Sequence, residues 1–224
     1  MKLGPLAAAA SSLFVASVAS ADALTVTPEA GDVAALPVVH ERRGGLVVGA
    51  AGGLGLIGAS GYPNNAKFYN DRDYYSETPL LVGWSTSFFA MLALTDWVSV
   101  GPSFTISEAD TAQWKSTALA GGLRAEFFPL VHAVPRLADL AIYGQVGVGA
   151  VALRAHGPYP TSDGVQSFVG VGVHHEWRFV DFLGAHASVG PYLEYDAVRS
   201  EPSDRNWLSL GLRVALYTSG NKSD

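Results

Sequence analysis

Most of this chain alternates between apolar residues and small or polar residues with a period of two, which is the pattern of β-strands. The stretch WLSLGLRVALY, residues 207–217, has leucine or valine at every second position and Arg213 among the residues between them. Such segments are each longer than the roughly five or six residues of a usual strand. There are eight of them, at about residues 45–59, 79–93, 97–107, 113–128, 140–154, 165–179, 183–198 and 206–217.

The two faces of these segments differ sharply in chemistry. One face is apolar, and its only charges are Lys115 and Arg154, near segment ends. Its leading members are Val82, Trp84, Phe88, Val98, Val100, Phe104, Leu119, Leu123, Ile142, Val146, Val148, Val169, Val171, Val173, Val189 and Leu193. The other face combines glycines with the charged and polar side chains Arg124, Glu126, His174, Glu176, Arg178, His186, Glu194, Asp196 and Arg213.

A glycine-rich face would be a poor water-facing surface and a poor strand former, so a soluble barrel or sandwich does not explain the pattern. In a membrane barrel the aliphatic face contacts lipid, and a narrow lumen holds small residues with mutually neutralising charges. The charged content of 15% is also well below the ~25% of soluble chains. The sequence therefore predicts an all-β protein, an antiparallel up-and-down transmembrane β-barrel of about eight strands.

The loops agree with this topology. Connections after even-numbered segments are mostly short, whereas the connections at residues 61–77 and 155–164 are long. Longer loops are typical of the extracellular end of outer-membrane barrels. Aromatic residues near the short turns predict an interfacial girdle of Phe89, Trp97, Phe127, Phe128, Trp177, Phe179, Phe182 and Tyr217.

The N-terminus predicts export. Lys2, an alanine-rich apolar run and Ala19-Ser20-Ala21 have the order of a signal peptide and its cleavage site, although a cut after Ala23 fits nearly as well. We divide the chain into a signal peptide (1–21), a periplasmic segment (22–43), the barrel (44–217) and a C-terminal tail (218–224). No further domain is expected after the barrel, and the absence of cysteine excludes disulfides.

Over residues 44–217 the chain resembles the small eight-stranded outer-membrane β-barrel proteins of Gram-negative bacteria, the OmpA-type and OmpX-type group. The last segment also resembles a barrel-assembly signal through Ser209, Gly211, Val214 and Leu216. The resemblance implies an outer-membrane location. It further implies contact with outer-membrane lipids and lipopolysaccharide, recognition by the barrel assembly machinery during biogenesis, and a structural or surface-interaction role through extracellular loops.

The polar face predicts a filled lumen in which these charges balance one another, because eight strands leave an interior only wide enough for side chains. His174, Glu176 and His186 are metal-ligating residue types, but without a diagnostic spacing we expect neither a metal nor a cofactor. The first long loop is the candidate surface-binding loop, with Tyr62, Phe68, Tyr69, Tyr74 and Tyr75 among asparagines and aspartates.

Two other functions stay open at this stage. His186, Ser188 and Glu194 distantly resemble the catalytic set of outer-membrane lipid A deacylases, and a barrel can also carry small apolar ligands. We expect a non-enzymatic protein whose extracellular partner is unknown. The net charge of −6 argues against nucleic acid, which needs a clustered basic face.

Overall fold

The computed structural model describes residues 43–65, 67–157, 160–182, 185–200 and 203–218. The predicted signal peptide, nearly all of the predicted periplasmic segment and the tail after Thr218 lie outside the described residues. None of the helices in the described part is long and apolar enough to cross a membrane.

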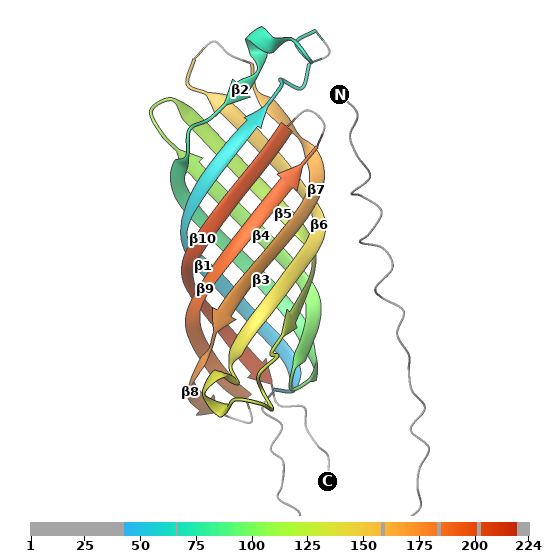
Figure 1. Ribbon diagram of the computed structural model, residues 1–224, viewed down its shortest axis with the longest axis vertical. Coiled ribbons are helices and arrows are strands. Elements are labelled where there is room, and N and C mark those ends of the chain that lie inside the picture. The colour runs from blue at the N-terminus through green and yellow to red at the C-terminus, as the bar shows by residue number, and fades with distance from the viewer. Residues whose placement is uncertain (1–42, 66, 158–159, 183–184, 201–202, 219–224) are drawn as a thin grey trace, which may run out of the picture. The chain divides into compact units, whose positions relative to one another are not determined.

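Eight long antiparallel strands wind around one barrel (Figure 1). They are β1 (Gly45–Gly61), β3 (Leu81–Thr95), β4 (Val98–Asp110), β5 (Trp114–Phe127), β6 (Leu140–Ala155), β7 (Ser162–His175), β9 (Ala185–Arg199) and β10 (Ser203–Thr218). Two shorter strands accompany them: β2 (Ser76–Glu77) pairs with β1, and β8 (Trp177–Phe182) follows β7 and pairs with β9. The single-turn helices η1 (Arg72–Tyr74) and η2 (Pro135–Leu137) lie in connections.

The barrel closes because β1 pairs with β3 on one side and with β10 on the other. This last pairing is long, running from Val47 opposite Tyr217 to Gly61 opposite Ser203. Closure gives each of the eight long strands a partner on both sides, so these strands satisfy their backbone hydrogen bonds without water, as a bilayer requires. The predicted up-and-down barrel is confirmed.

The two ends of the barrel differ. One end holds the start of β1, the end of β10, the tight turn after Thr95 and the connection 128–139. The opposite end carries the connection 62–80, seen at the top of Figure 1, and a three-residue turn after Asp110. We call this opposite end the extracellular end, because longer loops mark that side of outer-membrane barrels.

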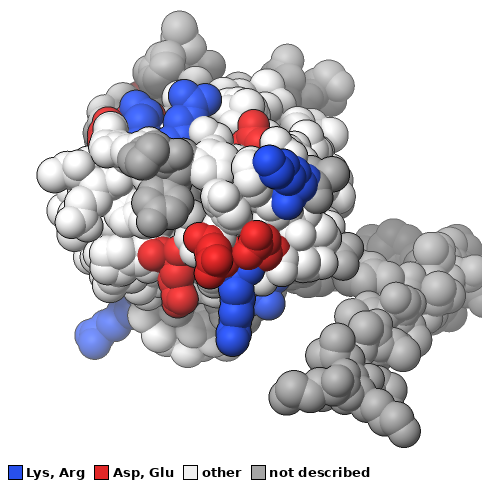
Figure 2. Space-filling model, turned by 90° about the horizontal axis from the view of Figure 1, so that it is seen from above, with Lys and Arg blue, Asp and Glu red and all other residues white. Residues whose placement is uncertain are grey.

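The exterior and interior are inverted relative to a soluble protein. On β10, Leu210 and Leu212 are 61% and 60% exposed, whereas Arg213 between them is 2% exposed. The same alternation holds for the apolar face predicted from sequence, most of whose members are exposed on the wall of the barrel. Seen from the extracellular end, charged side chains gather in a few groups and most of the surface is uncharged (Figure 2). The chain is an eight-stranded transmembrane β-barrel. Its architecture and apolar exterior are those of Gram-negative outer-membrane proteins.

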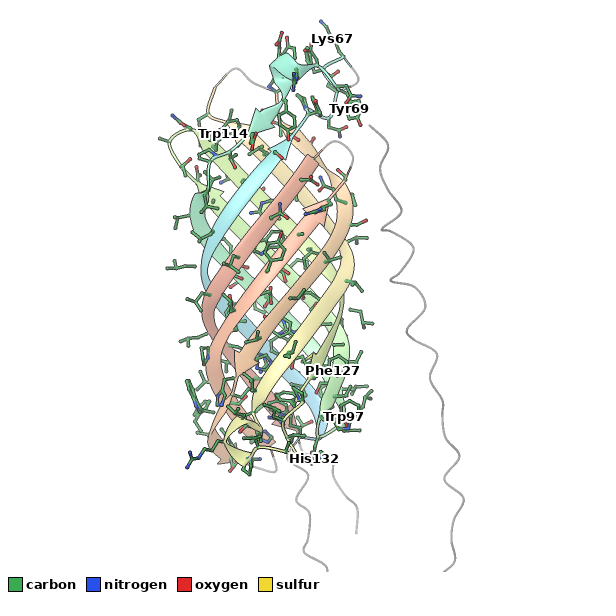
Figure 3. The ribbon with its side chains drawn as sticks, in the orientation of Figure 1. Lys67, Tyr69, Trp97, Trp114, Phe127 and His132 are labelled. Carbon is green, nitrogen blue, oxygen red and sulfur yellow. The ribbon has the colours of Figure 1, made fainter. Side chains whose placement is uncertain are left out.

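The aromatic girdle is only partly as predicted. Trp97 and Phe127 lie together at the lower rim with ring centroids 6.4 Å apart, and Trp177 and Phe179 are exposed near the same end (Figure 3). The predicted members Phe89, Phe128 and Tyr217 instead point inward and are buried. Proximity to a turn does not decide which way a ring points, because neighbouring residues of a strand face opposite sides. The side chain of Phe182 lies outside the described part.

Inward-facing glycines let neighbouring strands approach closely. Gly122 and Gly147 are opposite each other on β5 and β6, and a Cβ added to either would strike a carbonyl oxygen of the other strand. Elsewhere a large side chain covers its glycine partner, as the Tyr143 ring covers Gly172. Glycines and large polar side chains therefore share the inner face because one makes room for the other.

Candidate functional site in the lumen and the extracellular loop

Arg213 is the centre of the lower lumen. Its Nη2 atom donates to both carboxylate oxygens of Glu126, at 3.0 and 3.2 Å, and its Nη1 atom donates to Oε1 of Glu176. The hydroxyl of Tyr217 donates to the same Glu176 oxygen at 2.6 Å. A single buried arginine thus links two acidic side chains that come from different parts of the barrel wall.

Arg124 lies beside this group on β5. Its Nε atom donates to Oε1 of Glu126 at 2.9 Å, and its Nη1 atom is 3.5 Å from Oε2 of Glu194. The guanidinium also stacks over the ring of Tyr143, with its carbon 3.6 Å from the ring centroid. These contacts connect the Arg213 group to the carboxylates of β9.

Two residues that the sequence did not single out bind those carboxylates. The Tyr143 hydroxyl donates to Glu194 at 2.6 Å, and the Gln145 amide donates to Glu194 at 3.3 Å and to Asp196 at 2.8 Å. Ser103 in turn donates to the Gln145 carbonyl at 3.1 Å. Inward parity could have identified Tyr143 and Gln145, but both are neutral and so gave no charge signal.

His174 completes the lower lumen. Its Nε2 atom is 3.5 Å from Oε1 of Glu126, and its ring contacts the rings of Phe128 and Tyr143 at centroid distances of 5.8 and 5.6 Å. His186 and Ser188 are also buried on the inner face of β9, as predicted. The His186 ring stacks on Tyr217 at 4.6 Å.

Arg43 closes the end of the lumen opposite the extracellular end, here called the lower mouth. The sequence pattern did not indicate this role. Its backbone N–H donates to Asp96 Oδ1 at 2.9 Å, and its Nη2 atom donates to Asp139 Oδ1 at 2.6 Å and to the Ala138 carbonyl at 3.4 Å. The guanidinium lies 3.5 Å from the centroid of the Phe128 ring. Arg43 precedes the first alternating segment, so no periodic signal marked it.

Two details of the predicted network are wrong. Arg178 is exposed and pairs with Asp181 at 2.9 Å, because β8 starts after a break at Glu176 and its register with β9 shifts between Arg178 and Val180. If the last two strands form a hairpin, the sequence also predicts that Glu194 is within a diagonal neighbour's reach of Arg213. In the structure Gly190 is opposite Arg213, and Glu194 is opposite Ser209. The arginine pairs across the lumen instead of along the sheet.

The upper lumen is mainly apolar. The rings of Trp207 and Phe168 stack with centroids 6.1 Å apart, and Ile57, Leu81, Val151 and Val198 surround them. Above them Arg205 is buried and donates only to neutral oxygens among the described residues. Its partners are the Ser116 hydroxyl at 2.9 Å and the Ser107 hydroxyl and carbonyl at 2.6 and 3.3 Å.

Buried charges in the described part of the chain balance. The number of buried arginines equals the number of buried carboxylates. The arginines are Arg43, Arg124, Arg205 and Arg213, and the carboxylates are those of Glu126, Glu176, Glu194 and Asp196. An unpaired buried charge costs several kcal/mol, so this balance is a condition for filling the lumen with polar side chains. Large side chains with almost no exposure occupy both levels of the lumen.

The geometry does not assemble the catalytic set suggested by His186, Ser188 and Glu194. All three lie on one strand, and the six residues from Ser188 to Glu194 span roughly 20 Å at the rise of a strand. Glu194 is held by Tyr143, and no described hydrogen bond joins His186 to Ser188. The described residues also contain no group of three or more His, Asp or Glu side chains arranged to hold a metal ion.

The extracellular connection 62–80 is folded upon itself. Tyr62 packs against Tyr75 and Tyr69 with centroids 4.9 and 5.9 Å apart, and Phe68 packs against Tyr74 at 4.2 Å. All five aromatic residues predicted for this loop are thus in two small clusters. Tyr69 of the first cluster and the neighbouring Lys67 are labelled at the top of Figure 3.

The same connection is also bound to the barrel. Asp71 caps helix η1 by accepting a hydrogen bond from the Asp73 N–H, and β2 continues the sheet beside Ser60 and Gly61. The Thr78 hydroxyl accepts from the Ala59 N–H at 3.0 Å. The loop is therefore an ordered platform on the end of β1.

Comparisons with known proteins find similarity only at the level of solved structures, because no protein-family model and no curated protein matches the chain. The attachment invasion locus protein of Yersinia pestis is 10% identical with a TM-score of 0.45, covering 77% of this chain and 99% of that chain. Neisserial surface protein A is 16% identical with a TM-score of 0.40, covering 78% and 99%.

The N-terminal β-barrel domain of Pseudomonas aeruginosa OprF is 13% identical with a TM-score of 0.36, covering 79% of this chain and 100% of that chain. Similarities this distant carry no argument about role. The assignment as an outer-membrane barrel rests on the closed sheet, the apolar wall and the charged lumen described above.

Proposed function

We propose that this protein is an outer-membrane surface barrel that displays the connection 62–80 for interaction with an extracellular partner. The observation that carries the proposal is the construction of this connection, which packs its own aromatic residues and is bound to β1 through β2 and Thr78. An ordered loop loses little conformational entropy on binding, and that favours recognition.

The chemistry of the loop supports recognition. Tyr75 is 43% exposed, and Lys67, Asn70 and Arg72 are exposed around the aromatic clusters. Tyrosine with small polar residues is the mixture that binding loops use, because the ring offers a large contact area with few rotatable bonds. The large buried side chains in the lumen argue against a transport role.

The proposal is tested by replacing residues 62–75 with a two-residue Asn-Gly turn, which joins the paired residues Gly61 and Ser76. Proteoliposomes carrying the wild type or this variant are passed over an array of immobilised surface glycans and matrix proteins. We expect wild-type vesicles to be retained and the shortened variant to lose at least tenfold in retention. Shortening the extracellular connection 156–161 in the same way is the matched control and should leave retention unchanged.

Each barrel is first checked for its heat-dependent shift in electrophoretic mobility, so that unfolded protein is not scored as lost binding. Retention that survives the change at 62–75, or the absence of any retention by wild type, overturns the surface role. A steady ionic conductance of the wild type in planar bilayers would favour transport instead.

A further inference from the structure

The outer wall of the barrel has an apolar groove near the extracellular ends of β4 to β7. Its volume is about 440 Å³. The strand registers place Ile106, Leu119, Ala150 and Val165 side by side in one row across these four strands, all facing away from the lumen. The groove is therefore on the lipid side of the wall and is separate from the lumen network.

Two alanines form the floor of this groove. Ala150 and Ala152 are two residues apart on β6 and face the same side, between Leu119 on β5 and Val165 on β7. Val165 is 78% exposed and Leu119 is 45% exposed, so both larger side chains stand above the alanines. A channel one strand wide between two ridges has the shape needed to hold a hydrocarbon chain.

Cations stand at the extracellular end of the groove. Arg154 is the next outward residue of β6 beyond Ala152, and it is directly opposite Lys115 on β5. Two like charges directly opposite each other on a sheet face are destabilising unless nearby anions neutralise them. The prediction that these two cations are the only charges of the outer face is wrong, because Glu108, Asp163 and Arg199 also face away from the lumen.

The two cations differ in their partners. Lys115 lies 3.2 Å from a carboxylate oxygen of Glu108 and 3.5 Å from one of Asp110. Arg154 is exposed and makes no ion pair with any residue in the described part of the chain. Its guanidinium is free to bind an anion at the level where the apolar wall ends.

We infer that this groove binds a phosphate-bearing lipid of the outer leaflet, with the phosphate on Arg154 and an acyl chain along Ala150 and Ala152. A planar guanidinium binds two phosphate oxygens at once, which gives both charge and geometry. Asp163, opposite Ala152 on β7, is an acid on the other rim of the groove. The Asp163 carboxylate repels a second phosphate on the β7 side of the groove. The site therefore favours a headgroup whose anionic charge lies on the β6 side, at Arg154.

The acyl-chain contact and the phosphate contact can be tested separately. Native mass spectrometry of the purified full-length barrel in detergent is performed with added monophosphoryl lipid A or with the same lipid after dephosphorylation. We expect one phosphorylated lipid to remain bound to wild type and the dephosphorylated lipid to bind more weakly. Arg154→Gln should weaken binding of the phosphorylated lipid about fivefold and remove the preference for phosphate.

Ala150→Phe fills the groove and should weaken binding of both lipids. Matched controls are Arg199→Gln, which removes an exposed cation from the extracellular end of β9, and Ala90→Phe, which enlarges an exposed alanine of β3. Both controls should bind like wild type. Equal loss in Arg199→Gln and Arg154→Gln, or unchanged binding in Arg154→Gln and Ala150→Phe, overturns the site. Either result leaves the role proposed for residues 62–80 untouched.

Discussion

The guanidinium of Arg213 and the carboxylate of Glu126 meet across the barrel lumen, with Nη2 of the arginine 3.0 Å from Oε2 of the glutamate. The two residues lie on β10 and β5, which do not pair with each other. Their contact therefore crosses the interior instead of following the sheet, and it connects opposite walls of the barrel.

Arg213→Leu should lower the free energy of unfolding by about 3 kcal/mol, because it leaves Glu126 and Glu176 without their shared buried cation. Urea titration of the protein in lipid vesicles measures the loss. Arg199→Leu, which removes an exposed arginine, should change stability by less than about 0.5 kcal/mol. A loss below about 1 kcal/mol for Arg213→Leu would show that the lumen acids do not depend on it.

Leu212→Arg should also destabilise the barrel, but for the opposite reason. Leu212 faces lipid near the middle of β10, and an arginine near the middle of a bilayer costs about 2–4 kcal/mol. Leu216→Arg, closer to the end of the same face, should cost less, since the penalty falls to about 0–1 kcal/mol near the interface. The same urea titration compares the two, and equal stabilities would contradict the membrane depth assigned to β10.

Arg43→Ala should loosen the lower mouth. The change removes the side-chain bonds to the Asp96 carbonyl, Asp139 and the Ala138 carbonyl. We expect amide hydrogen exchange in the connection 128–139 to become roughly 10- to 100-fold faster, because a hydrogen bond to a charged group contributes about 1.5–3 kcal/mol. Arg136→Ala in the same connection is the control and should leave exchange unchanged.

Gly122→Val should block folding, because any Cβ at this position meets the backbone of β6. Gly58→Val is the matched control, since a Cβ at Gly58 meets nothing within 4 Å. Electrophoresis with and without boiling measures folding, because a closed barrel resists unfolding by detergent. The control should keep the mobility shift that Gly122→Val loses, and a folded Gly122→Val would disprove the close approach of β5 and β6.

Trypsin added to intact cells should cut within residues 62–80. Lys67 and Arg72 are exposed cleavage sites at the extracellular end. Arg136 and Arg178 are exposed at the opposite end and should be cut only after the outer membrane is opened. The reverse order of cleavage would show that the barrel is inserted the other way round.

Residues 62–80 show what composition predicts and what it does not. The aromatic and polar composition indicated a binding loop, and the long connection indicated its end of the barrel. The pairing of Tyr62 with Tyr75, and the hydrogen bonds to β1, depend on a chain reversal around Asn70, whose φ of 64° is a property of the folded loop. No residue pattern along the chain specifies such contacts.

Strand identity and face were determined by the sequence itself, because both follow from a period of two that is local to each strand. That period placed Arg213, Glu126 and Glu194 in the lumen and the leucines of β10 in lipid. It failed at Arg178, where a shift of register with β9 breaks the alternation.

Which side chains contact each other across the lumen was decided only by the tertiary structure. Which carboxylate Arg213 reaches, how Arg43 seals the mouth and where Ala150 lies between Leu119 and Val165 all depend on the relative register of strands around a closed barrel. Register is set by the pairing of whole strands and by close approaches such as that of Gly122 and Gly147, so it is not a property of any one segment.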